Sequence, residues 1–259
     1  VGTGGDGHGT YTVSTCAALV AAGAGVPIAK HGNRSVSSLS GSSDVLTALG
    51  VKLDVSPETI ASTISSANVG FMWAPMHHPA MKTWAPARGA LKIRTLFNLL
   101  GPIANPGRVT RQVVGVFDAQ WVEPIADALA SLGAEHVWVV HGSDGMDELT
   151  TTGPTMVAEV RDREVSVFEL TPDQAGLPLA NLDDLKGGDA EFNAQAIRDL
   201  LNGVRGPYRD IVCLNAGAAL VVGERAASIS EGVKRAAAAI DDGRAKAAWE
   251  KLVAASNDC

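Results

Sequence analysis

Short apolar runs alternate with helical patterns along much of the chain. The apolar runs are bounded by turn residues and predict strands at 26–29, 69–74, 113–117 and 136–141. The periodic segments between them predict helices at 14–24, 42–49, 57–66 and 122–132. Strands that alternate with helices in this way indicate an α/β fold, with a central, mainly parallel sheet flanked by helices.

The pattern changes after the fourth predicted strand. Segments 155–161 and 164–169 predict a hairpin that turns at Asp162 and Arg163. Mostly alanine-rich segments follow it, so we expect an all-helical C-terminal third that packs on the sheet. The helices expected there span 191–201, 208–223, 229–241 and 244–255.

The stretch 76–106 interrupts the alternation. We expect a helix at 81–91, then the segment 95–100, which ends at the helix breakers Gly101 and Pro102.

Composition narrows the class of protein. The 259 residues are 46% hydrophobic with a mean hydropathy of +0.12, which is enough to bury a sizeable core. There are 28 glycines, which favour close packing and a backbone that approaches ligands. No apolar stretch is long enough to predict a membrane span, and no signal peptide pattern opens the chain.

Charge and cysteine content exclude further classes. A net charge of −7 and a pI near 5.3 argue against a general nucleic-acid binder, which needs a basic surface. Cys16, Cys213 and Cys259 include no CxxC pair, so neither a disulfide framework nor a zinc site is expected. The pattern favours a reducing cytoplasm, with Cys16 and Cys213 as core thiols.

A glycine-rich segment, GTGGDG, occupies residues 2–7 and precedes Thr10 and the pair Ser14-Thr15 at a predicted helix start. Glycines let successive N–H groups face one concavity, and the helix N-terminus adds further donors for an anion. The alternative is a plain turn with a Ser/Thr helix cap. The segment matches neither the Walker nor the GxGxxG pattern. Such a loop normally follows a strand, so we expect this chain to lack its natural N-terminus.

Two polar segments follow predicted strands. KHGNRSVSS at 30–38 supplies cations and hydroxyls without an acid before Asp44, which suits phosphate oxygens. Asp147-Glu148 lies beyond the strand at 136–141, and adjacent carboxylates there suit Mg²⁺ with substrate phosphates. An ordinary acidic loop is the alternative for this common pair.

His77, His78 and Arg88 form a fourth candidate group, in the irregular stretch. Arg88 can bind a carboxylate with two hydrogen bonds, and the histidines can contact an aromatic ligand. A structural role is the alternative for the histidines, because a zinc site would need ligands that we do not find. We expect His8, His136 and His141 to be structural or exposed to solvent.

Taken together, these motifs resemble the anthranilate phosphoribosyltransferases. The resemblance runs in order along nearly the whole chain, and the combination of KHGNR with GTGGD is its most specific part. It is carried by GTGGDG at 2–7, ST at 14–15, KHGNRSVSS at 30–38, SGSSD at 40–44, HHPAM at 77–81, RTLFNLLGPIANP at 94–106 and HGSDGMDELT at 141–150.

The resemblance implies that the anthranilate amine attacks C1 of the ribose of phosphoribosyl pyrophosphate and expels pyrophosphate, in tryptophan biosynthesis. Lys30 and Arg34 would stabilise charge, and Ser14, Asp147 and Glu148 would hold Mg²⁺. Anthranilate would contact Gly2, His31, Asn33, His78, Arg88 and Pro102. The sugar diphosphate would contact Gly2, Gly5, Asp6, Thr10, Thr12, Ser14, Thr15, Lys30, Asn33, Arg34, Ser35, Ser37, Ser38 and Ser42.

The resemblance also implies a domain division and a homodimer. Residues 1–75 and 101–259 would form the large α/β domain that binds the sugar diphosphate, and 76–100 would be the remnant of a small helical domain. We expect this chain to lack the family's N-terminal helices, which usually supply the dimer contact. One position and one segment depart from the family pattern: Thr12 stands where the family usually has Asn, and 89–92 carries less charge than the family typically has.

Three alternatives remain open at this point. A pyrimidine nucleoside phosphorylase shares the general fold, but KHGNR and the paired acids suit a metal diphosphate better than free phosphate. A nucleic-acid-binding relative should show a basic face, against which the pI argues. The third is a catalytically inactive fragment that keeps the ligand loop.

Overall fold

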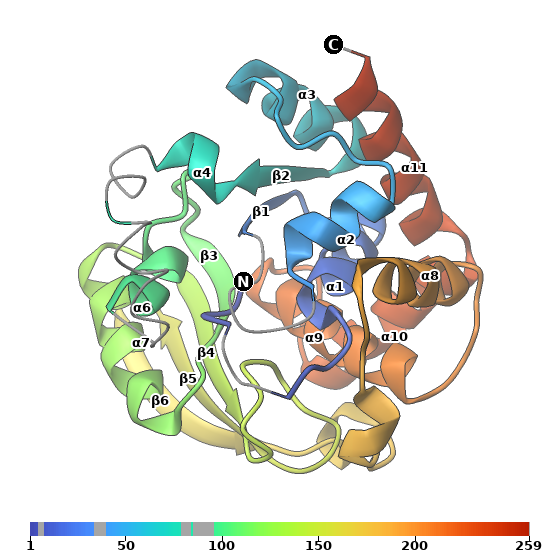
Figure 1. Ribbon diagram of the computed structural model, residues 1–259. Helices are drawn as coiled ribbons and strands as arrows, with labels where there is room; N and C mark the ends of the chain where they lie inside the picture. Colours follow the sequence, from blue (N-terminus) through green and yellow to red (C-terminus); the bar gives the residue numbers. More distant parts are fainter. Residues whose placement is uncertain (5–7, 34–39, 79–83, 85–95, 259) are drawn as a thin grey trace.

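The computed structural model describes residues 1–4, 8–33, 40–78, 84 and 96–258. Figure 1 shows the larger sheet and α7 on one side of the molecule and most of the helices on the other. The α/β class is confirmed. The strands are β1 (Ile28–Gly32), β2 (Val69–Trp73), β3 (Arg111–Gly115), β4 (His136–Gly142), β5 (Thr155–Arg161) and β6 (Glu164–Leu170). The α-helices are α1 (Val13–Gly23), α2 (Ser42–Ala48), α3 (Pro57–Ala67), α4 (Ala74–His77), α6 (Leu96–Ile103), α7 (Val122–Ser131), α8 (Ala190–Leu201), α9 (Pro207–Val222), α10 (Ile229–Asp241) and α11 (Arg244–Asn257).

The described strands form two sheets. β1 and β2 pair in parallel, with Lys30 opposite Phe71. The second sheet has the order β3-β4-β5-β6; β3 and β4 are parallel, whereas β4-β5 and β5-β6 are antiparallel. The pairing therefore includes both directions, and the antiparallel part contains the predicted hairpin, whose turn residues Asp162 and Arg163 both have positive φ.

Strand β4 is buried on both faces, which explains its continuous apolar sequence. Val137 and Val139 belong to the core under α7, whereas Trp138 and Val140 belong to the larger core shared with the helices. This alternation follows from the two-residue period of a strand. Cys16 and Cys213 lie in the larger core as expected, and burial raises the pKa of the Cys213 thiol to about 12.

The C-terminal helices approach each other closely. A Cβ added at Gly232 of α10 would lie 2.5 Å from the carbonyl oxygen of Gly217 of α9, so glycine is required for this spacing. Helix α9 lies in the larger core, and this packing places Asn215 of α9 in the interior, at 5% exposure.

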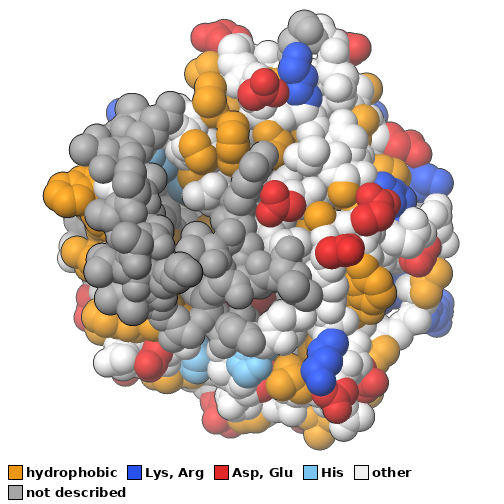
Figure 2. Space-filling view, in the orientation of Figure 1, with side chains coloured by type: hydrophobic (Ala, Val, Ile, Leu, Met, Phe, Trp, Pro, Cys, Tyr) orange, Lys and Arg blue, Asp and Glu red, His pale blue; other side chains and the backbone are white. Residues whose placement is uncertain are grey.

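No helix among the described residues is long and apolar enough to cross a membrane. Acidic and basic side chains of described residues are interspersed on the face in Figure 2.

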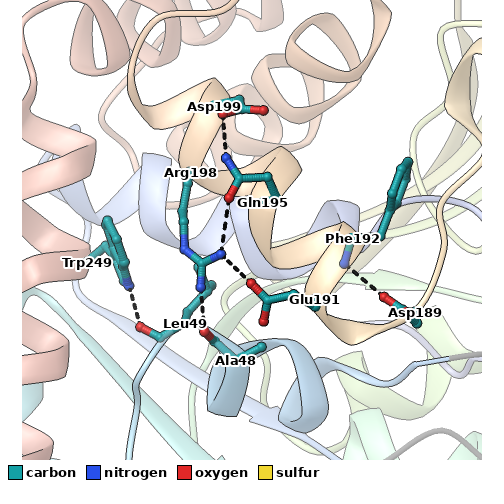
Figure 3. A network of polar contacts seen from close by, with 9 residues as sticks. All are labelled: Ala48, Leu49, Asp189, Glu191, Phe192, Gln195, Arg198, Asp199 and Trp249. Atoms are coloured by element: carbon teal, nitrogen blue, oxygen red, sulfur yellow. Dashed lines mark hydrogen bonds and ion pairs between the residues drawn. The ribbon is translucent and has the colours of Figure 1, made fainter.

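Helix α2 is held at its C-terminal end by side chains from two other helices (Figure 3). Arg198 of α8 donates to the carbonyl of Ala48 at 2.6 Å and pairs with Glu191 at 2.7 Å. Trp249 of α11 donates to the carbonyl of Leu49 at 3.1 Å. The last carbonyls of a helix lack partners within it, so these donors complete the end of α2.

Three predictions need correction. Helix α6 runs through Gly101 and Pro102 to Ile103, because a proline near the end of a helix removes only one hydrogen bond. Strand β1 begins at Ile28 instead of residue 26, since Pro27 has no N–H and pairing starts with the Ile28 N–H and the Asn68 carbonyl. Strand β3 begins at Arg111, two residues earlier than predicted. The helix expected at 81–91 falls outside the described residues, apart from Trp84.

Candidate active site

The first residues of the chain run along strand β3. The Thr3 N–H donates to the Gly115 carbonyl and the Gly115 N–H to the Val1 carbonyl, both at 2.9 Å. Gly2 and Gly115 form a parallel bridge. Residues 1–3 therefore continue the sheet beyond β3, and the glycine-rich segment starts at its edge.

The glycine-rich segment contacts the acid pair directly. The Gly4 N–H donates to Oδ2 of Asp147 at 2.6 Å. A Cβ added at Gly2 would lie 2.3 Å from the same oxygen, and one added at Gly115 would lie 1.6 Å from the Asp147 carbonyl oxygen. Real Cβ atoms do not approach other atoms this closely, so both positions need glycine for Asp147 to lie where it does.

The loop that carries Asp147 and Glu148 is fixed from both sides. Before the pair, Asp144 accepts the Met146 N–H at 3.1 Å and the hydroxyls of Thr150 and Thr152 at 2.6 Å each. After it, Asn215 of α9 pairs with the Leu149 backbone. Asp147 is buried, so its carboxylate is held in a defined place.

A buried cation lies opposite these acids. Lys30 of β1 is 8% exposed, and its Nζ donates to the Ser14 hydroxyl of α1 at 3.2 Å. Burial lowers the pKa of Lys30, while the charges of Glu148 and Asp147 oppose that shift. Opposite charges thus meet across one site, with Ser14 beside them.

His31 and His78 form the other end of the site. Their Nε2 atoms are 3.2 Å apart and their rings meet edge to face. Burial lowers the pKa of His31 to about 4, and the neighbouring His78, His77 and Lys30 add to the shift. The His31 ring is therefore neutral near pH 7, and the bond requires one ring to donate and the other to accept.

The hydroxyl groups of Ser14 and Thr15 do not take the cap position of helix α1, which the sequence left open as an alternative. Helix α1 begins at Val13 after Thr12, which makes no side-chain cap bond, so Ser14 and Thr15 lie inside its first turn and do not cap it. Oγ1 of Thr15 is buried and has no hydrogen-bond partner among the described residues. Ser42, the first residue of α2, donates to the Asn33 carbonyl at 3.3 Å. With 1% of its surface exposed, Thr15 is enclosed by the surrounding protein.

A cavity of about 470 Å³ lies between β1 and β3. Ser14, Lys30, His31 and Glu148 line it, so it reaches the charged site. Much of its remaining lining, including Val26, is apolar. The charged residues of this lining form the candidate site.

The described structure brings together only part of the expected site. Ser14, Lys30, Asp147 and Glu148 lie close to one another, whereas Thr10 forms an isolated bridge with Lys186 and Pro102 lies within α6. Among the described residues no group of three or more His, Cys, Asp or Glu side chains could hold a metal. Seven predicted residues lie outside the described part of the chain: Gly5, Asp6, Arg34, Ser35, Ser37, Ser38 and Arg88.

Sequence reasoning missed three residues that shape the site: Gly115, Asp144 and Asn215. Gly115 ends an apolar strand and Asp144 lies in a polar turn, and neither position looks unusual in the sequence. Asn215 had a signal, because it is an amide within the otherwise apolar segment CLNAGAAL at 213–220.

Comparison with known proteins identifies the family of this chain. Residues 1–246 match the glycosyl transferase family, a/b domain. Anthranilate phosphoribosyltransferases of Parvibaculum lavamentivorans and Rhodopseudomonas palustris (strain BisB18) are 61% and 57% identical over 257 residues, covering 99% of this chain and 75% and 76% of theirs.

Comparison with solved structures identifies the same family. Anthranilate phosphoribosyltransferase from Thermus thermophilus superposes with a TM-score of 0.92 at 46% identity, over 98% of this chain and 76% of that one. The enzyme from Saccharomyces cerevisiae, in complex with PRPP and Mg, also gives 0.92, at 29% identity over 100% of this chain and 73% of that one. The chain thus belongs to the glycosyl transferase family and, within it, to the anthranilate phosphoribosyltransferases.

Proposed function

We propose that this chain transfers the phosphoribosyl group of phosphoribosyl pyrophosphate to the amine of anthranilate, releasing pyrophosphate, in tryptophan biosynthesis. Family membership supports the reaction. The observation that carries the assignment to this site is the 2.6 Å hydrogen bond from Gly4 to Asp147, because it joins the anion-binding segment to the acid pair. Lys30 and Ser14 lie beside that junction.

The chain's own residues suit a sugar diphosphate with a divalent cation. Asp147 and Glu148 offer carboxylate oxygens, and Mg²⁺ favours one or two carboxylates together with substrate phosphates. Ser14 completes the proposed metal set, and Mg²⁺, when bound, supplies positive charge that neutralises the departing pyrophosphate. The Saccharomyces cerevisiae enzyme has been solved with PRPP and Mg.

Catalysis in this proposal rests on position and charge. An aromatic amine is already a neutral nucleophile, so no strong base is needed to activate it. Lys30 would place a positive charge near the leaving group, and the Thr15 hydroxyl would donate to a phosphate oxygen. Arg34 would add a second cation. The amine and C1 react directly, without a covalent intermediate.

Anthranilate would lie toward the two histidines. Because His31 is neutral near pH 7, its ring would contact the aromatic ring of anthranilate and would not form an ion pair with its carboxylate. Pro102 in α6 and Asn33 would complete this end, and Arg88 would bind the carboxylate. Gly2, which lies against Asp147, would be at the junction of the two substrates.

Three broader expectations stay predictions. These are the division into residues 1–75 with 101–259 and the helical part 76–100, the homodimer, and the cytoplasmic location.

The test is a Mg²⁺-dependent assay that follows the loss of anthranilate fluorescence with phosphoribosyl pyrophosphate. Turnover by the wild-type chain and its loss in Asp147→Asn supports the proposal. Arg88→Ala should raise KM for anthranilate far more than KM for the sugar diphosphate, and equal effects would contradict that role. Phosphorolysis of thymidine or uridine without transfer to anthranilate would favour a nucleoside phosphorylase instead.

A further inference from the structure

Asn215 joins the acid pair to helix α9 through the backbone of the next residue. Its Oδ1 accepts the Leu149 N–H at 3.1 Å, and its Nδ2 donates to the Leu149 carbonyl at 2.8 Å. Nδ2 also donates to the Ile211 carbonyl, one turn earlier in α9, at 2.9 Å. That third bond fixes the orientation of the amide, and the residue is 5% exposed, so water has little access to replace these bonds.

The contact acts on Glu148 directly. The Leu149 N–H belongs to the peptide group between Glu148 and Leu149, and that group is planar. The plane also contains the Glu148 Cα, so holding it against α9 restrains the point from which the Glu148 side chain extends and narrows the positions that the carboxylate can reach. Leu149 itself is fully buried, so the chain beyond the acid pair has no room to adjust.

The surroundings of Asn215 argue against packing as its only role. Val212, Leu214, Ala216 and Ala218 of the same helix segment are buried and apolar. A buried amide is costly unless its polar groups are paired, and here the pairing is with the loop that carries the acids. An apolar residue of similar size would fill the space equally well but leave the loop unattached.

We propose that Asn215 is a positioning residue that directs the Glu148 carboxylate toward the metal and the sugar diphosphate. The inference rests on the proposed function, because it takes Asp147 and Glu148 as Mg²⁺ ligands. Mutation of a residue that orients a metal ligand through hydrogen bonds typically lowers metal affinity by about 10–100-fold, and we expect an effect in that range.

The test compares two variants of Asn215 with a control connected to the same helix. Asn215→Asp keeps the size and the acceptor, whereas Asn215→Leu removes all three hydrogen bonds. The control Asp241→Ala breaks the 2.7 Å ion pair with the buried Arg209 of α9, which weakens the packing of α9 on α10 without touching the acid loop. Mn²⁺ binding is followed by electron paramagnetic resonance in the presence of phosphoribosyl pyrophosphate, and the Mg²⁺ dependence of turnover is measured alongside.

Both Asn215 variants should weaken Mn²⁺ binding by about 10–100-fold and raise the Mg²⁺ requirement similarly, with KM for anthranilate unchanged. Asp241→Ala should lower the thermal midpoint and leave Mn²⁺ binding as in the wild type. Wild-type Mn²⁺ binding in Asn215→Asp overturns the inference, as does loss of the folded state in both Asn215 variants, since Asn215 would then hold only the fold. If wild type and Asp147→Asn bind Mn²⁺ equally, the proposed metal role fails instead.

Discussion

The Gly4 N–H lies 2.6 Å from Oδ2 of Asp147, although the two residues are 143 positions apart in the chain. The bond connects a glycine-rich segment to a buried carboxylate. It depends on the close approach of three backbone segments: residues 1–4, the end of β3 and the loop after β4. A change in any of them should move the carboxylate relative to the glycine-rich segment.

Gly115→Ala tests this dependence. The new Cβ would lie 1.6 Å from the Asp147 carbonyl oxygen, so the acid loop must move, at a cost on the order of 1–3 kcal/mol in the free energy of unfolding. Because misplacement of about 1 Å can reduce turnover by about 100-fold, activity should fall more than stability suggests. Urea unfolding and the fluorescence assay measure the two effects.

Gly153→Ala is the matched control. Its Cβ would meet the Ser143 hydroxyl, which can rotate away, so we expect nearly wild-type stability and turnover. Equal losses of stability and turnover in the two variants would show that the close approach of Gly115 to Asp147 does not determine activity.

The sequence predicted the elements better than the contacts between them. Lys30 and Asp147 were expected in the site from local motifs, because charged residues after apolar runs are visible in the chain. Gly115 was missed because its need for glycine comes from the Asp147 carbonyl, which only the folded chain brings near. Asn215 was placed correctly in a helix, but its partner, Leu149, is 66 positions away.

The predicted end of the segment 95–100 was wrong, and helix α6 shows why. Gly101 and Pro102 are helix breakers by local propensity, yet the helix continues to Ile103. Leu99 and Pro102 are buried, so packing of this short helix outweighs the weak local preference. Tertiary contacts of this kind are not visible in a local pattern.

Arg198→Ala should destabilise the fold through helix α2. The charged guanidinium donates to the half-buried end of α2 at Ala48, and a hydrogen bond to a charged group contributes about 1.5–3 kcal/mol. The matched change Glu191→Gln removes an ion pair with a carboxylate that is 70% exposed, and should cost at most about 1 kcal/mol. Urea unfolding of both variants checks the order, and a larger loss in Glu191→Gln would contradict the role of the Ala48 contact.

Stability should fall on acidification because of His31. Its pKa in the folded protein is about 4, below the ordinary value of 6.5, so between these values the unfolded chain binds a proton that the folded chain excludes. The contribution of His31 is therefore complete above pH 6.5 and is lost progressively as the pH falls toward 4. His31→Gln should flatten the stability curve in this window. Parallel curves for the variant and the wild type, from urea midpoints at several pH values, would contradict the prediction.

Lys30→Met should separate activity from stability. Burial lowers the pKa of Lys30 below its ordinary value, which means that the folded protein disfavours the charged form relative to the unfolded chain. Methionine fills a similar volume without that cost, so the thermal midpoint should stay level or rise. Turnover with phosphoribosyl pyrophosphate should nevertheless fall by at least about 100-fold, since the charge that we propose beside the leaving group is gone. A variant that is destabilised but retains turnover would mean that Lys30 pairs with Asp147 and Glu148 for structure and takes no part in the transfer.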